Sequence, residues 1–183
     1  AARAQWRVVL TGVVILGLTG FVWQGLFNFY ELYVRAKGLP PSTASTAITV
    51  VFAAGVPAFA VSGPSGDRLP SVRYILAIVG SFAACLLALT VVDGALAVLA
   101  VSALVGYAVH SLFPAMDTYL LGTLPNEHRS SAYSVYSFGM MVIQATGASA
   151  VGALRGAGFG YDAVFLAFAL GLFALVAVLV ALR

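Results

Sequence analysis

The stretch AVFLAFALGLFALVAVLVAL, residues 163–182, carries no charged side chain and decides the fold class. About 20 consecutive apolar residues form a helix that crosses the hydrocarbon core of a bilayer, which is about 30 Å thick. Five further apolar runs precede it, at residues 8–30, 43–62, 74–92, 95–121 and 131–154. Continuous apolar runs predict helices, whereas a β-barrel would need apolar and polar residues to alternate. We therefore expect an all-α integral membrane protein with six transmembrane helices.

The composition excludes a soluble protein. Hydrophobic residues make up 62% of the 183 residues and charged residues 8%, with a mean hydropathy of +1.03, whereas soluble domains carry about 25% charged residues. The net charge of +3 comes from scattered Lys and Arg side chains, so no nucleic-acid partner is expected. The single cysteine, Cys85, lies near no His or Asp ligand set, so it is expected to be a buried thiol. Neither a metal nor another cofactor is predicted.

The ends of the chain and its basic residues predict the topology. The chain begins without methionine and its first apolar run is too long for a signal peptide, so we expect no cleaved leader and suspect a fragment. An even number of spans places both termini on one side, together with Arg3, Arg7, Arg68, Arg73, Arg129 and Arg183; Arg35, Lys37 and Arg155 fall on the other. The positive-inside rule then predicts cytoplasmic termini.

Polar side chains within the first span share one helical face. Gln24, Asn28 and Glu31 are spaced i, i+4 and i+7, beside Trp23 and Phe27. Polar groups at membrane depth usually face a cavity or one another. Gln24 and Asn28 therefore either line a substrate path or join helices by hydrogen bonds. Glu31 is either a proton-coupling residue or an ordinary solvated residue at the helix end.

The fourth span carries a second such face, with Tyr107, His110 and Asp117. His110 and Asp117 lie two turns apart and predict a proton-handling pair, since histidine titrates near neutrality and a buried acid can be shifted upward. The alternative for His110 is a neutral imidazole bonded to a serine or carbonyl. Asp117 lies at depth only if this helix continues to about Leu121. In the fifth span, Gln144 belongs to a similar polar stripe and is a further candidate for substrate contact.

Small residues recur at every fourth position of the fifth span and predict close helix packing. They form two stripes: Ala145, Ser149 and Ala153, and Ala148, Gly152 and Gly156. In the second span, Gly55 and Pro57 predict a weak point for bending.

The segment Gly63-Pro64-Ser65-Gly66 fits G-x-S-G, the nucleophile signature of intramembrane serine proteases. Such a nucleophile must lie recessed in an apolar environment. Here Asp67 and Arg68 follow at once in a polar loop, which argues against an enzyme. We therefore expect no catalytic residue.

The same loop, GPSGDRLPSVR at residues 63–73, resembles the G-x-x-x-D-R-x-G-R-R signature of the major facilitator superfamily. Gly63, Asp67, Arg68 and Arg73 take matching places, with Gly66 between them. Pro70, Ser71 and Val72 depart from the signature, where the family has Gly and basic residues.

A second loop is similar to the P-x-E-x-R-x-x-A stretch of that family. Its matching residues are Pro125, Glu127, Arg129 and Ala132, followed by glycines 139, 147 and 152. The resemblance covers the whole chain. It implies helices seven to twelve of a twelve-helix transporter, arranged as two inverted three-helix repeats at residues 1–92 and 93–183.

The resemblance implies a secondary active transporter in the cytoplasmic membrane of a prokaryote, working by alternating access. In such a half the first and fourth helices face the cavity. Expected contacts to a small organic solute are Trp23, Gln24, Phe27, Asn28, Tyr107, His110 and Gln144. Proton coupling is expected from His110, Asp117 and Glu31, and gating from Gly63, Gly66, Asp67, Arg68, Arg73, Glu127 and Arg129.

The expected partners are the bilayer, the solute with protons, and an amino-terminal six-helix half or a second copy. Three rival readings remain. The chain could be a homodimeric half-transporter, an intramembrane enzyme using Ser65 or His110, or a non-transporting membrane subunit.

Overall fold

The computed structural model describes the backbone of residues 2–68 and 71–182 and the side chains of residues 6–62, 72–127 and 129–182. Every regular element in these ranges is helical. The elements are α1 (Ala2–Ala36), α2 (Pro41–Arg68), α3 (Ser71–Val91), α4 (Ala95–Thr123), the short 3-10 helix η1 (Asn126–His128), α5 (Arg129–Ala145), α6 (Gly147–Gly156) and α7 (Tyr161–Ala181). With α5 and α6 taken as one interrupted span, six spans in this part of the chain are long and apolar enough to cross a membrane. The predicted all-α fold is confirmed.

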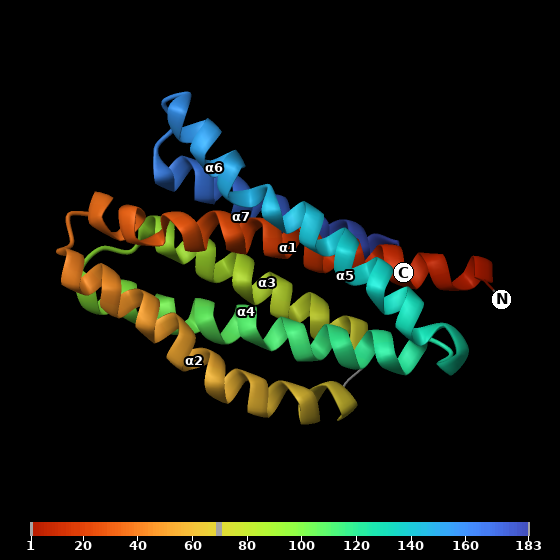
Figure 1. Cartoon of the computed structure of the whole chain (residues 1–183). Helices are drawn as coiled ribbons and strands as arrows, with labels where there is room; N and C mark the ends of the chain where they lie inside the picture. Colours follow the sequence, from red (N-terminus) through yellow and green to blue (C-terminus); the bar gives the residue numbers. More distant parts are fainter. Residues whose placement is uncertain (1, 69–70, 183) are drawn as a thin grey trace.

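The helices lie side by side in one bundle, with α3 between α4 and α7 (Figure 1). Helix α1 packs mainly on α5 and α6, and α4 packs mainly on α2. The start of α1, the end of α7 and the α4–α5 connection lie at one end of the bundle, and the α1–α2, α3–α4 and α6–α7 turns lie at the other (Figure 1).

The three turns at that second end each contain a glycine in the left-handed region. Gly38, Gly94 and Gly158 have φ angles of 78°, 83° and 94°. Side chains with a Cβ atom are strained at such angles, so glycine lets the chain reverse direction within a few residues. The turn at Asp93-Gly94 falls between the apolar runs predicted at residues 74–92 and 95–121.

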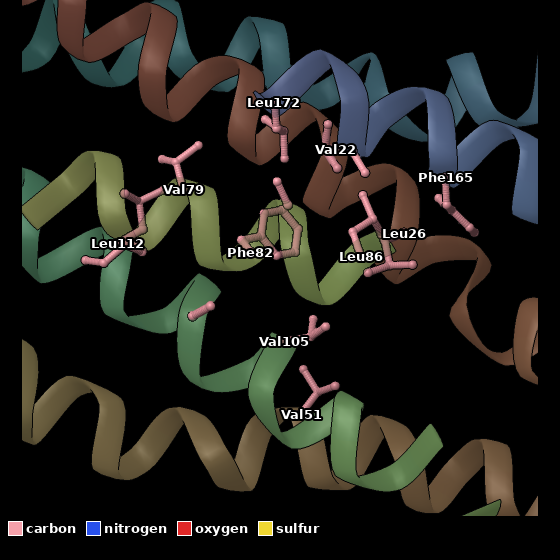
Figure 2. Packing of buried hydrophobic residues seen from close by; sticks show 14 of the residues in the cluster. Val22, Leu26, Val51, Val79, Phe82, Leu86, Val105, Leu112, Phe165 and Leu172 are labelled. Atoms are coloured by element: carbon pink, nitrogen blue, oxygen red, sulfur yellow. The ribbon is translucent and has the colours of Figure 1, made fainter. Parts of the chain in front are cut away.

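The core is centred on α3, whose apolar side chains reach both neighbouring layers. Figure 2 shows Phe82 and Leu86 of α3 between Val22 of α1 and Leu172 of α7 on one side and Val105 of α4 on the other. Phe82 and Leu86 are fully buried. Because α3 is covered on both sides, it joins α4 to α7.

Two helices continue beyond the ends of their predicted apolar spans. Helix α2 continues to Arg68, so most of the predicted loop at residues 63–73 has helical backbone. Helix α1 continues to Ala36, past Glu31. Polar residues mark where a span leaves the apolar layer, and a helix can continue into water beyond that point. Helix α4 ends at Thr123, so Asp117 lies well inside it.

The predicted fifth span is interrupted, which the apolar pattern did not indicate. Helix α5 ends at Ala145 and α6 begins at Gly147, with Thr146 between them. The Thr146 N–H and its hydroxyl both donate to the Ile143 carbonyl, at 3.2 and 2.7 Å. Gly147 lies against the Phe21 carbonyl of α1, so closely that a Cβ atom would overlap it. The break therefore lies next to a close backbone contact with α1.

The face of α5 and α6 that packs on α1 is not the one that carries the predicted stripe Ala145, Ser149 and Ala153. The approaching pairs are Gly17 with Ile143, Gly20 with Gln144 and Gly25 with Val151. Ala145, Ser149 and Ala153 are exposed instead. The stripe Ala145, Ser149 and Ala153 was wrong as a contact within this chain, because the room for close packing comes from glycines of α1 and from Gly139 and Gly147.

Candidate functional site

Four aromatic side chains and one histidine gather where α1, α2 and α4 meet. We call Trp23, Phe27, Phe52, Phe59 and His110 the His110 group. The His110 ring lies 6.0 Å from the Trp23 ring, 5.6 Å from Phe52 and 5.9 Å from Phe59, measured between centroids. Phe27 completes the group at 5.5 Å from Trp23 and 5.6 Å from Phe52. Phe52 and Phe59 are 47% and 51% exposed, so the group opens onto the surface of the bundle.

Two glycines let the imidazole fit between the helices. A Cβ atom on Gly55 of α2 would lie 2.7 Å from Cγ of His110, so only glycine leaves room for the ring. On α4 itself, Nδ1 of His110 lies 2.7 Å from the Gly106 carbonyl oxygen. The ring is therefore held by its own helix and covered by α2. This carbonyl contact matches one of the two predicted readings of His110.

The predicted amide pair lies beside the aromatic rings on α1. Asn28 Nδ2 donates to the Gln24 carbonyl at 2.8 Å and to Gln24 Oε1 at 3.4 Å. Asn28 is exposed and Gln24 half-buried. Because these bonds stay within one helix, the amides do not join helices in the described part of the chain. Gln24 Nε2 and Asn28 Oδ1 have no partner there.

Two predicted contact residues lie elsewhere. Tyr107 lines a groove between α3 and α4 with Tyr74, Cys85 and Ser111. Gln144 donates to the Leu16 carbonyl at 3.2 Å and so serves the contact between α5 and α1. The structure therefore brings Trp23, Phe27 and His110 together, but not Tyr107 or Gln144.

Asp117 and His110 do not contact each other. Asp117 accepts a hydrogen bond from the Tyr133 hydroxyl of α5 at 2.9 Å, whereas His110 is bonded to Gly106. Seven residues along a helix correspond to about 10.5 Å. A proton would need an intermediate carrier to pass between them.

The other predicted charged residues are at the bundle ends. Glu31 is exposed and lies 3.8 Å from Arg35, one helical turn away. Glu127 and Arg73 are exposed, and Arg129 donates to the Leu124 carbonyl at 3.3 Å. The side chains of Ser65, Asp67 and Arg68, and the surroundings of Gly63 and Gly66, lie outside what the structure describes. Among the described residues, no group of three His, Cys, Asp or Glu side chains is placed to hold a metal ion.

Sequence reasoning missed two features. Phe52 and Phe59 are spaced i and i+7 with Gly55 between them at i+3, a pattern that identifies one face of α2. At the opposite end from the termini, the Tyr33 hydroxyl lies 2.8 Å from the Leu89 carbonyl and 2.6 Å from Asp162 Oδ1. Lys37 lies 3.6 Å from the same Asp162 oxygen. This cluster joins α1, α3 and α7.

The fold and the site define a multi-pass helical membrane protein with an uncharged aromatic face around one histidine. A family model described as the Major Facilitator Superfamily matches residues 6–183. The chain belongs to this family, which confirms the predicted family. Members of the family are membrane transporters, so the match supports a transporter of the major facilitator type. A comparison with curated proteins gave no match.

Proposed function

We propose that this chain forms one six-helix half of a secondary active transporter that moves a small organic solute by alternating access. The observation that carries the proposal is the His110 group itself. His110 lies near the middle of the 29-residue helix α4 and is only half-buried. If His110, Gln24 and Asn28 faced lipid at this depth, the exposure of their polar groups to hydrocarbon would be unfavourable in free energy. A second half covering this face would turn it into a cavity at the membrane midplane.

The helix pairing supports two inverted repeats, at residues 1–92 and 93–183. The first helix of the first repeat, α1, packs on α5 and α6, the middle of the second. The first helix of the second repeat, α4, packs on α2, the middle of the first. Exchanged pairing of this kind is what a pseudo-two-fold relationship produces. Two such units can rock as one body against a partner half, which is either an amino-terminal half of the same polypeptide or a second copy.

We further propose that transport is coupled to protons. With Nδ1 of His110 facing a carbonyl, Nε2 is the nitrogen that can exchange a proton. Asp117 would act two turns away with Tyr133 as its partner, and Glu31 would act from the exposed end of α1. On this basis His110→Ala should abolish pH-driven transport. Unchanged transport by this variant would show that His110 takes no part in the coupling.

The proposed gate lies at the end of the bundle that holds the termini. Its residues would brace the helix ends in one conformation and separate in the other. They are Arg73, Glu127 and Arg129, together with Gly63, Gly66, Asp67 and Arg68. In the sequence, six basic residues fall on the side predicted for the termini and three on the other, which supports cytoplasmic termini in a prokaryotic plasma membrane. Surface labelling of single cysteines introduced at Arg7 and Phe159 tests this orientation, because only the second should react from outside the cell.

The decisive experiment measures both mass and transport. An antibody against α7 should detect a native polypeptide of about twice the 18.9 kDa computed for this chain. A band at 18.9 kDa would favour the homodimer. The native protein in proteoliposomes should then accumulate a radiolabelled aromatic solute under an imposed pH gradient.

Two results would favour the rival readings. Replacement of Gln24, Asn28 and His110 by leucine without effect would support a non-transporting subunit. Labelling by a serine-reactive probe that disappears in Ser65→Ala would support an enzyme.

A further inference from the structure

One nitrogen of His110 is available to a ligand. A carbonyl oxygen only accepts hydrogen bonds, so the contact of 2.7 Å to Gly106 requires the hydrogen of the neutral ring to be on Nδ1. Nε2 is then an acceptor. No described residue donates to it, although the ring is surrounded by side chains of α1 and α2.

The contact with α2 shows which edge of the ring is open. The atoms closest to a Cβ built on Gly55 are Cγ, Nδ1 and Cδ2 of His110, at 2.7, 2.9 and 3.0 Å. These atoms form the inner part of the ring, next to its own helix. Nε2 belongs to the outer edge, which extends beyond this contact. Among the described residues, the buried side-chain nitrogen and oxygen atoms without a hydrogen-bond partner belong to Thr19, Ser62, Arg129 and Tyr136. The unpaired Nε2 of His110 is not one of them, so it is at least partly accessible.

The surroundings of Nε2 are aromatic and uncharged. Trp23, Phe52 and Phe59 contact the imidazole, and no described acidic or basic side chain forms an ion pair or a ring contact with these three. A ligand carboxylate or phosphate would find no counter-charge here. A flat aromatic ring can instead stack on Phe52 or Phe59, which are about half exposed.

Resting on the proposed transport function, we propose that the His110 group selects an aromatic solute that bears an O–H or N–H group, which donates a hydrogen bond to His110 Nε2. The ring of the solute supplies the contact area and the donor fixes its orientation. The free Nε2 is the feature that distinguishes such a solute from a plain hydrocarbon of the same size.

The test compares two probes that differ in one hydrogen-bond donor. The native full-length protein in lipid nanodiscs is dialysed to equilibrium with 2-naphthol or with 2-methoxynaphthalene, and empty nanodiscs correct for partition into lipid. One hydrogen bond should favour 2-naphthol by about three- to tenfold in Kd. His110→Phe keeps a ring but removes the acceptor, so the two Kd values should become equal. His110→Gln offers Oε1 as an acceptor and should keep the preference.

Phe159→Leu serves as the matched aromatic control, since this side chain lies in the α6–α7 turn and should not alter either Kd. Equal Kd values in the wild type overturn the inference, and this result needs no variant to fold. Cyclohexanol binding as tightly as 2-naphthol also overturns it. A retained preference with no solute accumulation in proteoliposomes overturns the proposed transport alone. Accumulation of both probes to the same extent by the wild type, with equal Kd values, overturns this inference alone.

Discussion

Gly106 of α4 lies directly against the backbone of Val51 of α2, where a Cβ atom would overlap the Val51 carbonyl oxygen. This contact sets the spacing at which Gly55 covers the ring of His110. The Gly106 carbonyl also holds Nδ1 of that ring. One residue therefore both closes the α2–α4 pair and orients the imidazole.

Replacing Gly106 with alanine should open this pair. The overlapping atom is backbone and cannot rotate away, so α2 must shift, at a cost of about 1–3 kcal/mol in the free energy of unfolding. Gly80→Ala is the matched control, because no atom lies within 4 Å of a Cβ at that position of α3. It should leave stability unchanged or raise it by up to about 1 kcal/mol. Thermal unfolding in detergent measures both, and equal stability of the two variants contradicts the contact.

Gly147→Ala should weaken the junction between α1 and the interrupted span. A methyl group there meets the Phe21 carbonyl, again backbone, so α5 and α6 must move away from α1. We expect a loss of about 1–3 kcal/mol. Gly156→Ala, in the same helix and with open space around its Cβ position, should be tolerated. The movement can be measured with a pair of cysteines introduced across α1 and α6. Disulfide formation should be slower in Gly147→Ala and unchanged in Gly156→Ala.

The sequence predicted the fold because membrane helices obey a simple length rule. Runs of about 20 apolar residues locate helices regardless of their partners. The same rule cannot locate a break such as Thr146, because the rule does not include contacts between helices, such as that of the adjacent Gly147 with the Phe21 carbonyl. Nor does it show where a helix ends in water, as the extension of α2 to Arg68 demonstrates.

The candidate site was predictable only along single helices. Spacing placed Trp23 with Phe27, and His110 was singled out as a polar side chain at depth. Spacing also grouped His110 with Tyr107, because it does not show which neighbour each side chain meets. Tyr107 lies toward α3 and His110 toward α1 and α2, and this difference depends on how α4 is packed between them.

Tyr33→Phe should loosen the end of the bundle away from the termini. The Tyr33 hydroxyl has one hydrogen and two acceptors, the Leu89 carbonyl and Asp162. Its removal should cost about 0.5–1.5 kcal/mol in the free energy of unfolding. Tyr74→Phe is the control, since the Tyr74 hydroxyl has no hydrogen-bond partner in the described part of the chain. A double-mutant cycle with Asp162→Ala, which removes the acceptor, should show coupling for Tyr33 and none for Tyr74. Additive effects at Tyr33 would rule out the bond to Asp162.

Asp117→Asn separates a proton-coupling role from a structural one. The asparagine oxygen can still accept the Tyr133 hydroxyl, so the α4–α5 contact is retained and stability should change by less than about 0.5 kcal/mol. The side chain can no longer exchange a proton. Accumulation of solute under a pH gradient should therefore fall to passive equilibration, while exchange of labelled for unlabelled solute at equal pH continues.

Tyr133→Phe makes the opposite change, because it keeps the acid and removes the donor. It should lower stability by about 1 kcal/mol and leave pH-driven accumulation above the passive level. Both variants are compared in proteoliposomes with a solute that the wild type accumulates. Full accumulation by Asp117→Asn would show that Asp117 serves only the contact with Tyr133, and coupling would then rest on His110 or Glu31.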